Sequence, residues 1–552
     1  MKKFKVFVLI LVSALLIVGC SSKNNASTPA EKEENNQQTP SAPAAESDGA
    51  LNITYFDPNG MSDRIAGDVW LNRGDLYKVL MFRSLFLPEP DLQNVNPDLA
   101  ESYQVSDDKL TYTIKMKDGL KWHDGDDLTA EDVVWSIKTV LKASQVNAIY
   151  TTAFSSIEGA ADWKDGKSDD LSGISFEGNT VTIKLDSPVG NFIPVLGQFA
   201  IKPKHLLENE NPLEIHNSEF WKNPVGSGMY KIEKIEPGNY ATFVPAETYE
   251  GTKPKIQKLV LTAMSEPTAA AKTGKLDFFN TNVAEFIEGM KEVDGFSSHP
   301  IDILFYRYFV VNIQGADGNV NEKMADKRVR EALMYAIDRK TLTEQLYPGL
   351  SALLSTGVPT SFDESYGDAP EYEYNPEKAK QLLEEANFDF NQTIKLRFYY
   401  GDQTSVNFMT AVAQYLTNIG MKVDVLKFQG DATTELYKTR DYDIALKGLS
   451  AFGLEEYYAE YASTNQSFIN IIGKEGHFDE LVKKLNETED LDERQAILTE
   501  LQKLEVEHLY KLPLYTTKNY FYINDNKVKT ASKFGNPWYN YDMDFEQWEI
   551  IK

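Results

Sequence analysis

The sequence is short of cysteine and histidine, the residues that build disulfides and many metal sites. Its 552 residues contain one cysteine, Cys20, and six histidines. One cysteine cannot form an intramolecular disulfide, so no disulfide framework is expected. The histidines lack the spacing of a zinc-binding helix, and neither a phosphate-binding glycine loop nor a GxSxG nucleophile motif is present. The sequence therefore gives no positive support for an enzyme, and we expect no cofactor and no metal.

Positive charge is also scarce. The chain has 56 lysines and arginines against 83 acids, which gives a formal net charge of −27. Nucleic acids and anionic membrane surfaces both attract clusters of Lys and Arg. This balance therefore argues against nucleic acid and against direct binding to a membrane surface. It fits an exported, soluble and monomeric body.

Long apolar runs are missing except at the N-terminus. Three lysines among the first five residues precede the apolar run 7–18. That run is shorter than the roughly 20 residues that span a bilayer, and its charge order is that of a secretory signal. Small Gly19 then precedes Cys20, and the sequence IVGC at 17–20 resembles a lipobox. We expect a signal peptide at 1–19 and a lipid tether on Cys20; the alternatives are an uncleaved anchor or a chance buried cysteine.

A polar stretch follows the cysteine. Residues 21–48 contain no aromatic residue and no Leu, Ile, Val or Met. Such a segment cannot offset its ordering entropy by burial. We therefore expect residues 20–50 to form a lipidated, disordered linker to the body.

The body alternates strand and helix patterns. Residues 110–117 alternate as a half-buried strand does, and Thr129 can cap a helix with acids in its first turn. The strand 393–400, helix 404–418 and strand 421–428 form a βαβ unit, which implies parallel pairing. Further helices are predicted from Asp326, Asp338 and Asn375 onward and over 491–509, and a strand over 512–523. The body is therefore α/β, and its length predicts at least two lobes.

Six blocks resemble, in order, those of family 5 extracellular solute-binding proteins, the oligopeptide-binding lipoproteins of ABC importers. The first reads LAESYQVSDDKLTYTIKMKDGLKWHDGDDLTAEDVVWSI at 99–137, and the second begins NPVGSGMYKIEKIEPG at 223. The others lie at 273–280, 326–342, 374–388 and 493–515.

The resemblance implies a two-lobed, periplasmic-binding-protein-like α/β fold with a hinge and an extra domain inserted in the first lobe. A ligand would be trapped in the cleft by hinge closure. The expected parts are lobe 1 at 51–90, 201–282 and 516–552, the extra domain at 91–200, and lobe 2 at 283–515.

The resemblance also implies three segments that line the cleft, where backbone groups can pair with a peptide as an added strand. Ordinary loop packing is the alternative for each residue. The residues expected to bind ligand are Leu71, Asn72, Arg73, Asn280, Thr281, Asn282, Gly430, Tyr437, Leu449, Ser450, Ala451, Phe452 and Glu455.

The third segment departs from the family pattern. Relatives carry an aspartate that pairs with the free α-amino group of the ligand, and this chain has Phe452 there. Leu449 stands at the usual tryptophan position. Glu455 and Glu456 are candidates to replace the missing acid, and the alternative is that nothing does.

The function implied is capture of oligopeptides and their delivery to the permease subunits of an ABC importer. Within this class, the alternatives are a specialised signal peptide, an oligosaccharide or a metal chelate. A secreted hydrolase and a surface adhesin are alternatives from other classes.

Overall fold

The computed structural model describes residues 49–56, 76–143, 153–473, 476–531, 534 and 543–551. The predicted signal peptide, the linker as far as residue 48, Cys20 and the segment 71–73 lie outside these residues. Within the described ranges, no helix combines the length and hydropathy that crossing a bilayer requires.

Eleven strands of the described residues form one mixed sheet. In spatial order they are β15 (Lys422–Lys427), β14 (Thr393–Phe398), β16 (Ile444–Ser450), β12 (Phe296–Val311), β17 (Lys511–Asn524), β11 (Phe278–Thr281), β1 (Ala50–Phe56), β10 (Lys258–Met264), β9 (Tyr240–Pro245) and β8 (Tyr230–Glu236), with β13 (Ser351–Leu353) paired to β17.

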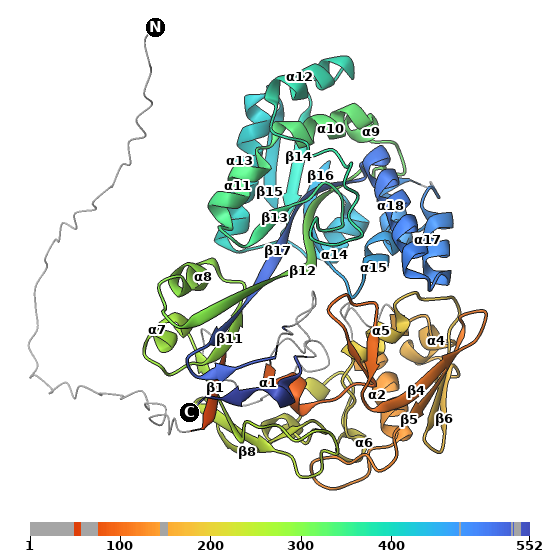
Figure 1. Ribbon diagram of the computed structural model, residues 1–552. Coiled ribbons are helices and arrows are strands. Elements are labelled where there is room, and N and C mark those ends of the chain that lie inside the picture. The colour runs from red at the N-terminus through yellow and green to blue at the C-terminus, as the bar shows by residue number, and fades with distance from the viewer. Residues whose placement is uncertain are drawn as a thin grey trace, which may run out of the picture. The chain divides into compact units, whose positions relative to one another are not determined.

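β12 and β17 belong to both halves of this sheet (Figure 1). Residues 305–311 of β12 pair with β16, whereas residues 520–523 of β17 pair with β11. Between these regions the β12–β17 ladder changes register, between Asp302 and Tyr306. We call this pair of strands the crossing ribbon. It joins the two lobes of an α/β fold, as expected.

The second-lobe half of the sheet is covered by helices on both faces. Side chains of β12 alternate: Tyr306 and Tyr308 enter one core, and Phe309 and Val311 enter the other. The first core receives α15 (Leu454–Ala459), α16 (Gln466–Ile472), α17 (Asp479–Glu487) and α18 (Leu491–His508). The second receives α9 (Glu322–Ala325), α10 (Lys327–Ala336), α11 (Arg339–Leu346), α12 (Pro376–Glu385) and α13 (Gln403–Asn418).

The first-lobe half has its own core. It contains side chains of β1, β8, β9, β10 and β17, together with α1 (Leu76–Met81). A smaller core lies between β11, β17 and the helices α7 (Pro267–Lys272) and α8 (Ala284–Met290). Near the end of the described chain, β18 (Val528–Lys529) pairs with β19 (Glu549–Ile550).

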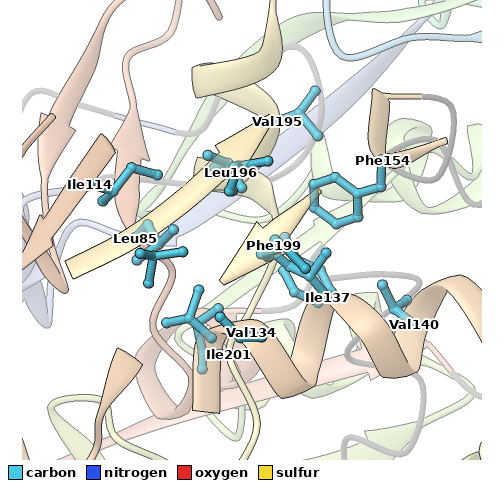
Figure 2. Packing of buried hydrophobic residues seen from close by; sticks show 14 of the residues in the cluster. Leu85, Ile114, Val134, Ile137, Val140, Phe154, Val195, Leu196, Phe199 and Ile201 are labelled. Carbon is cyan, nitrogen blue, oxygen red and sulfur yellow. The ribbon is translucent and has the colours of Figure 1, made fainter. Parts of the chain in front are cut away.

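A separate four-stranded antiparallel sheet has the order β4-β5-β7-β6. Figure 2 shows its core, where Val134, Ile137 and Val140 of one helix meet Phe154 and Phe199. We call this sheet and its helices the four-stranded unit. Its elements are β4 (Ala100–Val105), β5 (Thr111–Met116), β6 (Ile174–Glu177), β7 (Thr180–Lys184), α2 (Ala130–Ala143), α4 (Ala160–Lys164) and α5 (Phe192–Gln198).

Short elements flank the four-stranded unit. They are β2 (Phe86–Pro88), β3 (Val95–Pro97) and α6 (Lys204–Leu207). The unit lies where the extra domain is expected, and the residue boundaries given for the domains remain predictions.

Candidate functional site

The second predicted segment lies on the first-lobe side of the crossing ribbon. Asn280 and Thr281 end β11 and pair with β17. Thr281 is buried, and its Oγ1 accepts a hydrogen bond from the Val283 N–H at 3.1 Å. Asn282, the next residue, is exposed. This segment is therefore fixed by the sheet up to the point where it turns outward.

The third predicted segment lies on the second-lobe side of the same ribbon. Leu449 and Ser450 end β16, where they pair with Tyr306 and Phe305 of β12. The buried Ala451 then donates its N–H to the Leu304 carbonyl oxygen at 3.0 Å. The structure thus brings two of the three predicted segments to the borders of the ribbon, and the first lies outside the described residues.

One edge of β16 is left open. The parallel ladder between β14 and β16 ends at the pair Phe398 and Leu446. Beyond it, residues 447–450 of β16 have no strand partner on that side among the described strands, although the Gly448 backbone contacts the Tyr400 hydroxyl there. Unpaired backbone groups on a strand edge can accept an extended peptide.

Phe452 does not point to open space. It keeps 2% of its surface exposed and belongs to the core of the four-stranded unit, although it lies just after β16 of the second lobe. Leu92 does the opposite: it comes from the turn between β2 and β3, but it lies in the second-lobe core together with Tyr457 and Tyr458. The two apolar side chains therefore fasten the four-stranded unit to the second lobe.

The neighbouring acids already have partners. Glu455 is buried and forms an ion pair with Arg494 of α18. Glu456 accepts hydrogen bonds from Asn191 Nδ2 and from the Phe452 N–H, both at 3.1 Å. Burial raises the pKa of Glu456 to about 7, against the smaller opposing effect of these two donors.

A groove of about 600 Å³ lies beside these contacts. This volume is within the roughly 300–1,000 Å³ of ligand pockets. Its lining comes from the four-stranded unit and from the second lobe and includes Tyr103, Tyr112, Asn191, Glu455, Leu491 and Arg494.

The remaining predicted residues lie apart from this groove lining. Gly430 is exposed, and Tyr437 is half-buried in a π-helical turn at Glu435–Thr439 that follows α14 (Ala432–Thr434). Burial raises the pKa of Tyr437, while the charge of Lys447 opposes that effect.

Lys447 belongs to a buried charged cluster in the second lobe. Glu460 lies between Lys447 and Lys511, with Oε2 2.7 Å from the Lys511 Nζ. Tyr308 Oη also donates to Glu460, at 2.9 Å. Burial opposes ionisation of Glu460, but the two lysines outweigh it and lower the pKa to about 2. No sequence motif predicted this cluster, because its members are scattered along the chain.

Comparison with known proteins gives matches over most of the chain. The oligopeptide-binding protein AppA of Bacillus subtilis is 26% identical over 555 residues, 94% of each chain. A putative ABC transporter peptide-binding protein of Brucella ovis is 27% identical over 364 residues. That match covers 63% of each chain, so this chain spans less than two thirds of that relative.

Solved structures share the fold. A putative peptide binding protein AppA from Clostridium difficile has a TM-score of 0.74 at 22% identity, covering 91% of this chain and 100% of that chain. The Bacillus subtilis oligopeptide-binding protein AppA in complex with a nonapeptide has a TM-score of 0.65 at 23% identity, covering 91% and 99%. The family described as bacterial extracellular solute-binding proteins, family 5 Middle, matches residues 94–468. Since this match covers more than half of the sequence, the chain belongs to the family 5 bacterial extracellular solute-binding proteins.

Proposed function

We propose that this protein binds oligopeptides between its lobes and delivers them to the permease subunits of an ABC importer. The observation that carries the proposal is the open edge of β16 at residues 447–450, beside the crossing ribbon. An extended peptide can add to such an edge through its own backbone, whatever its side chains are. The names of the relatives, peptide-binding and oligopeptide-binding, support this ligand class.

The aspartate that pairs with the ligand's N-terminus in relatives is replaced by Phe452 in this chain. A free α-amino group has a pKa of about 8, so it is charged near neutral pH. The Phe452 side chain is buried in the core of the four-stranded unit, and the charge of Glu455 is paired with that of Arg494. Glu456, with its pKa raised to about 7, is only partly ionised at that pH. We therefore propose that short peptides with free N-termini bind weakly, and that peptides with a blocked or protruding end bind better.

The first experiment is mass spectrometry of the ligand released when the purified protein is denatured. Peptides are expected, and calorimetry with tri- to hexapeptides, each with a free and an acetylated N-terminus, then measures the preference. If many peptides with a free N-terminus bind tightly and acetylation abolishes the binding, the proposal that free N-termini bind weakly is wrong. Release of an oligosaccharide or a metal chelate overturns the peptide proposal, and turnover of a bound peptide overturns the non-enzymatic role.

A further inference from the structure

Arg307 stands out among the arginines of this protein. Eight arginines lie in the described residues, and seven of them donate hydrogen bonds to carboxylates or carbonyl oxygens. Among the described residues, the Arg307 side chain has neither a hydrogen bond nor an ion pair; the residue is half-buried, and its Nη1 is buried without a partner. A buried donor that lacks a partner is costly, so this exception needs a reason.

Its position in the sheet is specific. Arg307 lies in β12, opposite Gly448 of β16 and Tyr515 of β17. It therefore sits where the crossing ribbon enters the second lobe. Gly448 belongs to the part of β16 whose other edge is open. The carboxyl ends of parallel strands, here β14 and β16, are the usual place for ligands in α/β sheets.

Aromatic rings hold the guanidinium in place. Its Cζ lies 3.5 Å from the centroid of the Tyr400 ring and 4.9 Å from that of Phe305. The absence of a side chain at Gly448 makes room for this arrangement, because a Cβ there would lie 2.6 Å from the Phe305 ring and 2.7 Å from Tyr400 Oη. Tyr399 Oη lies 2.7 Å from Tyr400 Oη and restrains that ring. Stacking on a ring face leaves the hydrogen-bonding edge of a guanidinium available.

The acids near this position are engaged elsewhere. Asp402 feels the charge of Arg307, yet its carboxylate caps α13 by accepting hydrogen bonds from the N–H and Oγ of Ser405, both at 2.8 Å. Asp302, earlier in β12, pairs with Lys518 at 2.7 Å. Neither acid neutralises Arg307 by a direct contact.

We propose that Arg307 binds a carboxylate of the ligand, at the open edge of β16. The proposal rests on the ligand binding between the lobes, as proposed above. A guanidinium offers two parallel donors that match the two oxygens of a carboxylate. The carboxylate can belong to the C-terminus of a peptide or to an acidic side chain, and the experiment separates these sources.

The probes are three N-acetylated peptides: an alanine pentapeptide with a free C-terminus, its C-terminal amide, and the amide with aspartate at the central position. Calorimetry on the wild-type protein should show the free acid binding about 10- to 100-fold more tightly than the amide, the range expected for a charge-assisted hydrogen bond. Recovery of affinity by the aspartate peptide would identify a side-chain carboxylate as a second acceptable source. Equal affinities of acid and amides in the wild type overturn the proposal and leave peptide binding standing.

Variants test whether Arg307 causes the preference for the free-acid peptide. Arg307→Gln should remove this preference. Arg307→Lys should keep only part of it, because lysine lacks the two parallel N–H donors of the guanidinium. Arg328→Gln is the matched control, since Arg328 lies in the same lobe but pairs with Asp326 at the surface. A preference that persists in a folded Arg307→Gln variant overturns the proposal.

If none of the three peptides binds, the peptide function fails and the ligand that co-purifies decides the role of Arg307. An acidic ligand that the wild type retains and Arg307→Gln loses supports the proposal. A neutral ligand, or no retained acid, overturns it.

Discussion

Asn191 Nδ2 donates a hydrogen bond to Glu456 Oε1 across 265 residues of sequence, at 3.1 Å. Asn191 precedes α5 of the four-stranded unit, and Glu456 lies in the first turn of α15 in the second lobe. Two further contacts join the same parts: the Gly190 N–H to Asn486 Oδ1 at 3.0 Å, and the ion pair of Lys109 with Glu489. Any opening of the second lobe away from the four-stranded unit has to break these contacts and expose Glu456 to water.

We predict that the folded state gains stability at Glu456 as the pH falls. Burial raises the folded-state pKa of Glu456 from 4.5 to about 7 and outweighs the opposing effect of its two hydrogen-bond donors, so the folded environment favours the protonated carboxyl. Its stabilisation is complete below about pH 4.5 and is lost as the pH rises through about 7. The change should be on the order of 1–3 kcal/mol in the free energy of unfolding.

Denaturant unfolding of the wild type and of Glu456→Gln, measured between about pH 4.5 and 7.5, tests this prediction. The other charged groups at the contact are the Glu455–Arg494 pair, Lys109 and Glu489, and the variant leaves them all in place. Glu456→Gln should therefore have the flatter pH profile. Parallel profiles for the two proteins would contradict the prediction.

Phe452→Ala should weaken the attachment of the four-stranded unit to the second lobe. Removing a buried phenylalanine ring costs about 3–5 kcal/mol. Small-angle scattering should show a larger radius of gyration for the ligand-free variant, together with a lower unfolding midpoint. Phe176→Ala is the control, because Phe176 lies on β6 of the same unit with 46% of its surface exposed. Equal changes in radius of gyration and unfolding midpoint for the two substitutions would mean that Phe452 does not hold the four-stranded unit to the second lobe.

Glu460→Gln should be among the most damaging single substitutions in the second lobe. It leaves Lys447 and Lys511 buried without their shared counter-charge, a loss of about 3–5 kcal/mol. Because the folded pKa of Glu460 is lowered to about 2, its stabilisation is present above about pH 4.5 and is lost as the pH falls toward 2. Urea unfolding at neutral pH measures the loss. Glu500→Gln, which breaks an exposed pair with Lys503, should change stability by less than about 1 kcal/mol.

Cys20→Ser should abolish lipidation and release the protein from the membrane. The motivation is a lone cysteine that directly follows the apolar run and Gly19. Labelling of growing cells with a fatty acid followed by immunoprecipitation reports the modification. Equal label in the wild type and the variant would rule out a tether through this residue.

Local structure was the most predictable part of the fold. Asp338 and Asn375 are predicted to cap helices, and their side chains accept hydrogen bonds from the backbone N–H groups of Thr341 and Lys378, at 3.0 and 2.9 Å. The βαβ prediction is confirmed as well, since β14 and β15 pair in parallel. Helix caps and hydrophobic periodicity depend on residues that are close in the sequence, so a single sequence is enough to predict them.

The partners of the candidate site residues were not predictable. Glu455 and Glu456 are neighbours in sequence, yet one pairs with Arg494 of its own lobe and the other with Asn191 of the four-stranded unit. Such choices depend on how distant elements pack, which no local pattern encodes. Arg307 did leave a signal that was missed, because it is the single charge in the apolar and aromatic run LFYRYFVV at 304–311.

The sharing of β17 by both halves of the sheet has a consequence for the order of assembly. β12, β11 and β13 all pair with β17, which comes late in the chain at residues 511–524. A growing chain that has not yet reached these residues lacks the strand that connects its two half-sheets, and β12 keeps an unpaired edge. Contacts of such long sequence separation also form slowly. A polypeptide with this topology cannot complete its large sheet until residues 511–524 have been made.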